Sequence, residues 1–326
     1  MDLSILIVTY NSAPLMDALL SQLHAEIHSP TFGWKAEVVL VDNGSRDGTA
    51  EQVDTRHPWV KRVPNRINLG FAAGNNLAAK SASGRYLLLL NPDAVPAPGA
   101  LAQGIALMDA HPEAGMAGGE LRNTRGEREP SARMFPTLRD EVFTMSGLAA
   151  KYPQSRTFAR LDRRWADPEQ DAAVDWIPGA FVFLPRTVFL KLGGFDERFF
   201  MYYEEVDLCR RLQQAGYSVL YWPRLKAVHI GGASAKTVTS ARVSRAGSQL
   251  ESWRMRSAML YYRKHHGLSG AFGLMAIEWV WHRLRGLRAA LRRQTDKASD
   301  MAMHCSQLRQ AWTDTHSGTT SPVKPW

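Results

Sequence analysis

The sequence predicts an α/β protein with a mostly parallel, doubly wound sheet and a C-terminal helical appendage. Two observations predict this fold class. Short apolar runs alternate with helical patterns through the first half of the chain, which is typical of parallel strands joined by helical crossovers. Beyond about residue 240 the pattern becomes helical throughout. Polar clusters follow several apolar runs, so functional loops are expected at the carboxyl ends of the strands.

The expected strands are apolar runs bounded by polar or turn-forming residues. Leu3–Tyr10 is apolar enough to be buried on both faces of a sheet. The other runs expected to be extended are 37–42, 60–63, 85–90, 115–118, 174–184, 218–222 and 227–229.

The expected helices carry apolar residues at intervals of three and four. Ser12 and Pro14 suit a helix start, and the first apolar stripe consists of Leu15, Leu19, Leu20 and Leu23. Further helices are expected at 49–56, 68–83, 98–110 and 204–216, the last ending at Gly216.

The chain is expected to consist of three segments. Residues 1–240 form the sheet domain, 241–312 form a basic amphipathic helical segment, and 313–326 form a disordered tail. Residues 120–175 are rich in Arg, Glu and Pro with weak periodicity, and we expect a variable insertion over the functional site.

The chain of 326 residues has a formal charge of +9, all of it in the last quarter. Residues 1–240 hold 26 basic and 26 acidic side chains, whereas 241–326 hold 14 and 5. Arg285, Arg288 and Arg292 lie towards one side of the expected helix. The opposite apolar face consists of Ile277, Val280, Trp281, Leu284, Leu287 and Leu291. This pattern favours a helix lying on a membrane surface.

Two alternatives remain for the basic segment. A helical pair can instead pack on the sheet domain with its arginines in water. A nucleic acid is the other anionic partner, but no nucleic-acid-binding motif is present and no such partner is expected. Two cysteines, Cys209 and Cys305, form neither a disulfide framework nor a zinc spacing, and the N-terminus lacks signal-peptide features. We therefore expect a cytoplasmic protein, peripheral on the inner face of the cell membrane.

Acidic and amide side chains follow three of the expected strands. Asp42 can accept hydrogen bonds from a base or a ribose, or simply cap a turn. Asp93, in Asn91-Pro92-Asp93, can hold Mg²⁺ or Mn²⁺ beside a phosphate, or belong to an Asn-Pro turn. His229 ends a strand before two glycines, where metal or phosphate contact is as plausible as a structural role. The glycines of 68–76 match neither a dinucleotide-binding motif nor a P-loop, which argues against a dehydrogenase or an ATPase.

The densest cluster places Glu204, Glu205 and Asp207 beside four aromatic residues. Clustered acids next to apolar surface tend to have one raised pKa, which suits a general base. A solvated helix start with dipole-favoured acids is the alternative. Arg211 follows on the same helix and can hold phosphate.

Six ordered motifs, at 8–11, 41–49, 68–71, 91–93, 176–180 and 194–208, resemble those of family 2 inverting glycosyltransferases, most of all the rhamnosyltransferase-like branch. The resemblance implies a GT-A fold over about residues 3–235 and a metal-dependent hexosyltransferase. It implies roles for thirteen side chains and glycines. The nucleotide would contact Thr9, Tyr10, Asn11, Asp42, Asn68, Gly70 and Arg211. The sugars would border Trp176, Gly179 and Ala180. The metal would be held by Asp93, His229 and Asn91.

The same resemblance implies the chemistry. Glu205 takes the place of the family's catalytic Asp, with Asp207 as second candidate and Glu204 beside them. The base would deprotonate an acceptor hydroxyl as it attacks the anomeric carbon. The favoured donor is dTDP-rhamnose, with UDP-sugars as alternatives, and the acceptor is a glycan or lipid-linked glycan in cell-wall and cell-surface polysaccharide biosynthesis. The chain departs from the family pattern at two positions, with Glu in place of Asp at residue 205 and Asn in place of Asp at residue 91. The alternative to an active enzyme is therefore an inactive sugar-nucleotide or glycan-binding module.

Overall fold

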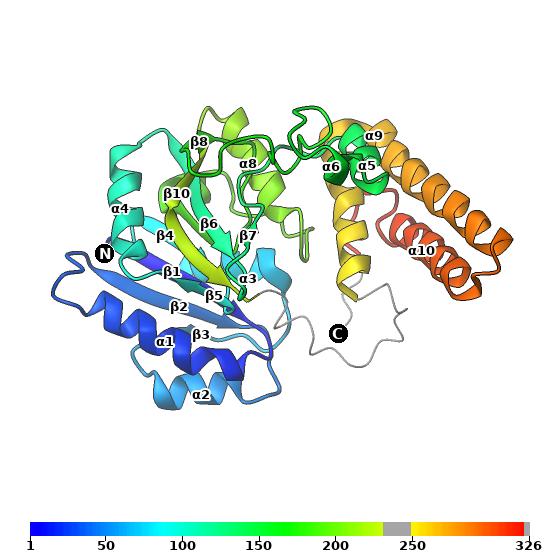
Figure 1. Ribbon diagram of the computed structural model, residues 1–326. Coiled ribbons are helices and arrows are strands. Elements are labelled where there is room, and N and C mark those ends of the chain that lie inside the picture. Colours follow the sequence, from blue (N-terminus) through cyan, green and yellow to red (C-terminus); the bar gives the residue numbers. More distant parts are fainter. Residues whose placement is uncertain (231–248, 323–326) are drawn as a thin grey trace.

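The computed structural model describes residues 1–230 and 249–322, and it contains one mixed sheet with two helical layers and a projecting helical hairpin (Figure 1). The expected sheet-domain boundary at residue 240 lies outside the described residues. The strands in chain order are β1 (Leu3–Thr9), β2 (Ala36–Asp42), β3 (Lys61–Val63), β4 (Tyr86–Leu90), β5 (Ala94–Pro96), β6 (Ala114–Arg122), β7 (Arg128–Glu129), β8 (Ala172–Ala173), β9 (Phe181–Pro185) and β10 (Ser218–His229).

The sheet order is β3-β2-β1-β4-β9-β6-β10-β5, with β7 beside β6 and β8 beside β10. Strands β3, β2, β1 and β4 are parallel, as expected. The second half is mixed, because β9 runs antiparallel between β4 and β6, and β5 runs antiparallel to β10. The sequence did not predict these reversals. The two strands expected at 218–222 and 227–229 are one strand, β10, with a register irregularity between Trp222 and Lys226.

The helices in chain order are α1 (Ala13–Ile27), α2 (Thr49–Arg56), α3 (Gly70–Ser81), α4 (Ala100–Ala110), α5 (Leu138–Met145), α6 (Leu148–Lys151), α7 (Arg186–Lys191), α8 (Glu204–Gln214), α9 (Gln249–Leu291) and α10 (Thr295–Asp314). Successive residues of β1 point to opposite faces of the sheet, so each face has its own core. Ile5 and Ile7 pack with residues of α1, α2 and α4, whereas Leu6 packs with residues of α3, α7 and α8.

The C-terminal helices consist of two parts with different surroundings. Helix α9 breaks at Gly267 (φ 68°, ψ −170°). Its first part contributes Met255, Ala258 and Met259 to the same hydrophobic core as α3 and α8. Its second part pairs with α10 and projects from the sheet domain (Figure 1). Helix α5, from the expected insertion, packs against α9.

The tail expected to be disordered from residue 313 is ordered in its described part. Helix α10 extends to Asp314, whose carboxylate pairs with Arg256. Thr315 is fully buried and donates to the Ala311 carbonyl at 2.7 Å. The ion pair of Asp314 with Arg256 and the close approach of Gly318 to Met259 place this stretch against α9.

Candidate active site

One cavity of about 340 Å³ lies at the carboxyl edge of the sheet. The loops after β1, β2 and β4, the residues before β9, the end of β10 and the starts of α8 and α9 line it. The lining residues predicted from the sequence are Thr9, Tyr10, Asn68, Gly70, Asn91, Asp93, Gly179, Ala180, Glu204, Glu205 and His229. The remaining predicted residues, Asn11, Asp42, Trp176, Asp207 and Arg211, are not part of this lining.

Asp93 and His229 lie together because β5 and β10 pair antiparallel, with His229 opposite Ala94. His229 Nε2 is 3.5 Å from Asp93 Oδ1, and His229 Nδ1 is 2.9 Å from Glu129 Oε2. A carboxylate on one ring nitrogen is the usual support for a histidine whose other nitrogen binds a metal. The donor set of Asp93, His229 and the neighbouring Asn91 therefore fits a divalent cation.

The charge of His229 depends on the same carboxylates. Its hydrogen bond with Asp93, and then that with Glu129, raises the pKa of His229 to about 9. Without a cation the imidazolium balances both carboxylates at neutral pH. A cation bound by His229 would displace that proton, since a histidine ligand must be neutral.

Glu204 and Glu205 open α8 and line the cavity. The two residues before them, Tyr202 and Tyr203, both have positive φ (70° and 68°). Left-handed backbone is costly for a side chain as bulky as tyrosine, and such strain gathers at functional sites. The turn formed by Tyr202 and Tyr203 directs the start of α8 towards the cavity.

Glu204 is buried and Glu205 is partly buried, and in the part of the chain that the structure describes each has one buried oxygen without a hydrogen-bond partner. That oxygen is Oε2 in both residues. Burial raises the pKa of Glu205 to about 7. Burial, and then the charge of Glu205, raise the pKa of Glu204 well above its usual value. A partly buried carboxylate with a spare acceptor oxygen and a pKa near neutrality is suited to accept a proton.

Asp207 and Arg211, by contrast, form an ion cluster away from the cavity lining. Arg211 Nε is 2.8 Å from Asp207 Oδ2, and the other nitrogens of Arg211 donate to the carbonyls of Leu192 and Gly194. Lys264 and His265 of α9 lie 2.6 and 2.8 Å from the other Asp207 oxygen. Asp207 was expected near the acceptor and Arg211 near the diphosphate, but in the structure neither side chain is part of the cavity lining. The pair instead anchors α8 to α9.

This ion cluster predicts a stability effect. Asp207 is fully buried, so Asp207→Asn leaves Arg211, Lys264 and His265 short of their shared partner. Breaking a buried ion pair in this way costs about 3 kcal/mol or more of unfolding free energy. Chemical denaturation measures it. Asp171→Asn, which breaks an exposed ion pair with Arg224, is the matched control and should have little effect. Equal stability of the two variants would contradict the anchoring role.

Asp42 and Asn11 stabilise the loops behind the cavity. Thr9 and Asp42 are register partners at the ends of β1 and β2, and Thr9 Oγ1 donates to Asp42 Oδ1 at 3.0 Å. Ser45 N donates to Asp42 Oδ2 at 3.0 Å. Asn11 Oδ1 accepts from Arg46 N at 2.9 Å. Asp42 therefore lies in a hydrogen-bonded network outside the cavity lining, whereas its neighbour Asn43 lines the cavity.

Gly70 and Gly179 allow close approach inside the cavity. Gly70 has φ +82°, and a Cβ there would meet the Phe200 carbonyl oxygen at 2.3 Å. A Cβ on Gly179 would meet the Phe71 ring at 3.1 Å. Trp176, expected to border the donor sugar, instead donates from Nε1 to the Met134 carbonyl at 2.9 Å. Its neighbours Gly179 and Ala180 line the cavity.

Comparison with known proteins decides the family. The model of the family described as "Glycosyl transferase family 2" matches residues 4–170. The chain is 31% identical over 242 residues, 70% of this chain and 75% of the relative, to an N-acetylglucosaminyl-diphospho-decaprenol L-rhamnosyltransferase of Mycobacterium tuberculosis. The chain belongs to glycosyl transferase family 2. The resemblance inferred from the six motifs is confirmed.

Other relatives of this family 2 glycosyltransferase agree. Rhamnosyltransferase WbbL of Escherichia coli is 30% identical over 170 residues, 49% of this chain and 60% of WbbL. Among solved structures, a mannosyltransferase from Pyrobaculum calidifontis in complex with GDP-Man and Mn²⁺ has a TM-score of 0.55 at 18% identity, over 97% of this chain and 87% of that one. The predicted GT-A fold is confirmed.

The cavity of this family 2 glycosyltransferase is also lined by residues that the sequence did not assign to the site. Gln249, Leu250 and Trp253, at the start of α9, line the cavity. Trp253 is buried and its ring centroid lies 4.3 Å from that of Phe200. Tryptophan beside arginines is also typical of a membrane surface, but Trp253 is buried and so does not face one. No local pattern could have placed it, because the contact joins segments far apart in the sequence.

Proposed function

We propose that the chain transfers a sugar, with inversion, from a nucleoside diphosphate to a hydroxyl of a glycan or lipid-linked glycan. One observation carries the proposal. A single cavity combines a strand-edge pair suited to a cation, Asp93 and His229, with a partly buried carboxylate whose pKa is near neutrality, Glu205. Binding of the donor needs the cation site, and activation of the acceptor needs the carboxylate. The match of the chain to known rhamnosyltransferases supports rhamnose as the favoured sugar.

Each group has a defined part in this mechanism. Asp93 and His229, with Asn91 beside them, would hold Mg²⁺ or Mn²⁺, which when bound supplies positive charge to the departing diphosphate. Thr9, Tyr10, Asn43 and Asn68 offer polar groups to the nucleotide. Glu205 accepts the proton of the acceptor hydroxyl as the C–O bond to the anomeric carbon forms and the bond to the diphosphate breaks. A single displacement of this kind inverts the anomeric configuration.

A donor screen tests the proposed reaction. The full chain is incubated with dTDP-rhamnose, UDP-hexoses and UDP-galactofuranose, with Mg²⁺ or Mn²⁺, and with lipid-linked or free glycan acceptors. We expect acceptor-dependent release of the nucleoside diphosphate, largest with dTDP-rhamnose. Binding of the donor without release under every condition would favour an inactive sugar-nucleotide-binding module instead.

The pH profile should follow Glu205. The base acts only when it is deprotonated, and burial raises its pKa to about 7. We therefore expect kcat/KM to fall as the pH drops below about 7, whereas a glutamate of ordinary pKa would hold the rate constant down to roughly pH 5. Initial rates across this interval, with a saturating cation, measure the profile. A flat profile between these values would contradict Glu205 as base.

The second part of α9 also supports a membrane surface as the working location. Val280, Leu284, Leu287 and Leu291 lie within one side of this helix, and their exposed fractions are 48, 60, 60 and 79%. Exposed arginines flank this apolar stripe, with Arg283 on one side and Arg285, Arg288 and Arg292 on the other. No helix in residues 1–230 or 249–322 has an apolar stretch long enough to cross a bilayer. An apolar stripe bordered by cations matches the interface of an anionic lipid bilayer, and we propose that the protein is peripheral on the inner face of the cell membrane.

Vesicle flotation tests the stripe. Replacing Leu284, Leu287 and Leu291 by Ser should weaken binding to phosphatidylglycerol vesicles by about 100-fold or more, since burying one leucine contributes about 1.5–3 kcal/mol. Leu190→Ser together with Val142→Ser removes exposed apolar side chains elsewhere and is the matched control. Equal flotation of both variants and the wild type would exclude this surface as the membrane contact.

A further inference from the structure

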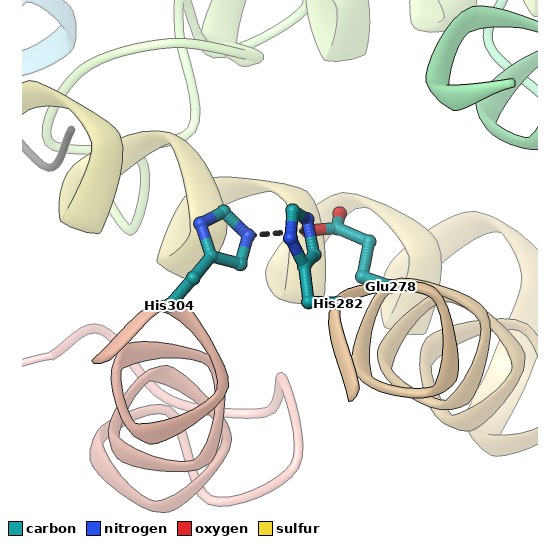
Figure 2. Close-up of side chains that lie close together, drawn as sticks. All are labelled: Glu278, His282 and His304. Atoms are coloured by element: carbon teal, nitrogen blue, oxygen red, sulfur yellow. Dashed lines mark ion pairs between the residues drawn. The ribbon is translucent and has the colours of Figure 1, made fainter. Parts of the chain in front are cut away.

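The hairpin of α9 and α10 contains a second cluster of metal-ligand side chains, separate from the cavity. Glu278 and His282 are one helical turn apart on α9, and His304 faces them from α10 (Figure 2). One possible ligand atom from each residue lies within 4.8 Å of the other two. Glu278 is 3% exposed, so its carboxylate lies between the helices rather than in water.

The spacing suits a metal better than a hydrogen bond. His304 Nε2 and Glu278 Oε2 are 3.6 Å apart, and within the described residues the buried His304 Nε2 has no hydrogen-bond partner. Zinc bonds of about 2.0–2.1 Å place neighbouring ligand atoms of a tetrahedral shell roughly 3.4 Å apart. The two side chains therefore already stand at the separation of co-ligands.

The contacts of His282 leave one nitrogen for a metal. Its Nδ1 is 3.3 Å from the thioether sulfur of Met301. A thioether accepts but cannot donate, so Nδ1 carries the proton in this contact and Nε2 keeps its lone pair. The His282 and His304 ring centroids lie 3.7 Å apart with the ring planes tilted by 32°, so the two imidazoles, one from each helix, lie next to each other.

The surroundings of the cluster hold more negative than positive side chains. Glu141 and Arg254 interact electrostatically with Glu278, and Glu251 interacts with both histidines. These three carboxylates interact with the guanidinium of Arg254, and a second guanidinium, that of Arg285, interacts with His282. A buried carboxylate is costly without a cation, and Arg254 is already bonded to Glu251. A divalent cation would offset this excess of negative charge.

We propose that Glu278, His282 and His304 bind one Zn²⁺ ion, with water as the fourth ligand. Two imidazoles and one carboxylate form a donor set that zinc prefers, whereas Mg²⁺ and Mn²⁺ prefer oxygen ligands. The site is thus chemically distinct from the cation site at Asp93, where Asp93 and Asn91 offer oxygen and only His229 offers nitrogen. Because its ligands come from both helices, the ion cross-links α9 to α10.

The cross-link fixes the surface that we assign to the membrane. Ala289, buried against α10, continues the face of α9 that carries Glu278 and His282. At 100° per residue, the exposed stripe of Val280, Leu284, Leu287 and Leu291 lies on the opposite side of the helix. Zinc would therefore hold the hairpin closed while leaving the stripe accessible.

Zinc binding to the tag-free full chain tests the site. The starting protein is Asp93→Asn/His229→Ala, which removes the cation ligands of the cavity. After dialysis against Zn²⁺ and measurement of bound metal, we expect one ion per chain and a raised unfolding temperature. Adding Glu278→Gln, or His282→Ala with His304→Ala, should weaken zinc binding by about 100-fold or more and abolish the rise in unfolding temperature.

Two controls keep the outcome interpretable. His316→Ala removes an exposed histidine at the end of α10 and should retain the ion. Far-ultraviolet circular dichroism and a cooperative thermal unfolding transition report whether each variant is folded. Absence of a bound ion in the starting protein overturns the site. Full retention of the ion after loss of Glu278 or of both histidines also overturns it.

Discussion

Replacing Glu205 by Gln should reduce kcat by about 10²–10⁴-fold, the usual contribution of a general base. The substitution keeps the size of the side chain and its place at the start of α8, so the dissociation constant of the donor should change little. Steady-state rates and isothermal titration with the nucleotide sugar measure the two effects separately.

The matched control for this variant is Glu113→Gln, which alters an exposed glutamate far from the cavity lining and should leave both constants unchanged. Glu204→Gln distinguishes the two neighbouring carboxylates, since only one of them need accept the proton. A Glu205→Gln enzyme with wild-type kcat would remove this residue from the chemistry.

Replacing Asp93 by Asn should abolish the response of the enzyme to Mg²⁺ or Mn²⁺ and lower turnover by about 10³-fold, because the cation contributes several kcal/mol to transition-state charge stabilisation. His229→Ala should raise the cation concentration needed for half-maximal rate. Nucleoside diphosphate release measured against cation concentration, with chelator-treated wild type as reference, gives both results.

A matched control for the cation site is Asp2→Asn, at an ion pair with Arg85 outside the cavity lining. Its cation dependence should equal that of the wild type. An Asp93→Asn enzyme that still needs the cation at the wild-type concentration would place the metal elsewhere.

The parallel half of the fold and the strand-edge residues were predictable from local patterns. Apolar runs locate β1, β2 and β4, and the carboxyl ends of such strands meet at one edge, so Thr9, Asn91 and Asp93 were expected together. His229 was also predicted, but the cause of its position, the antiparallel pairing of β5 with β10, has no local signature.

The rest of the site depends on contacts between distant segments. Asp207 and Glu205 are indistinguishable in a run of acids, yet only tertiary packing brings Lys264 and His265 of α9 onto Asp207. The same packing places Trp253 in the lining of the cavity. Glu278 and His282 show the spacing of helical co-ligands, but His304 joins them only through the hairpin of α9 and α10.

The position of the cation tests the central claim most directly. The crystal structure of the protein with Mn²⁺ and the nucleoside diphosphate released in the donor screen would give an anomalous peak for manganese. We predict this peak within coordination distance of Asp93 and His229, in contact with the diphosphate, in the cavity that Glu205 also lines. Manganese and diphosphate bound outside that cavity would contradict the account.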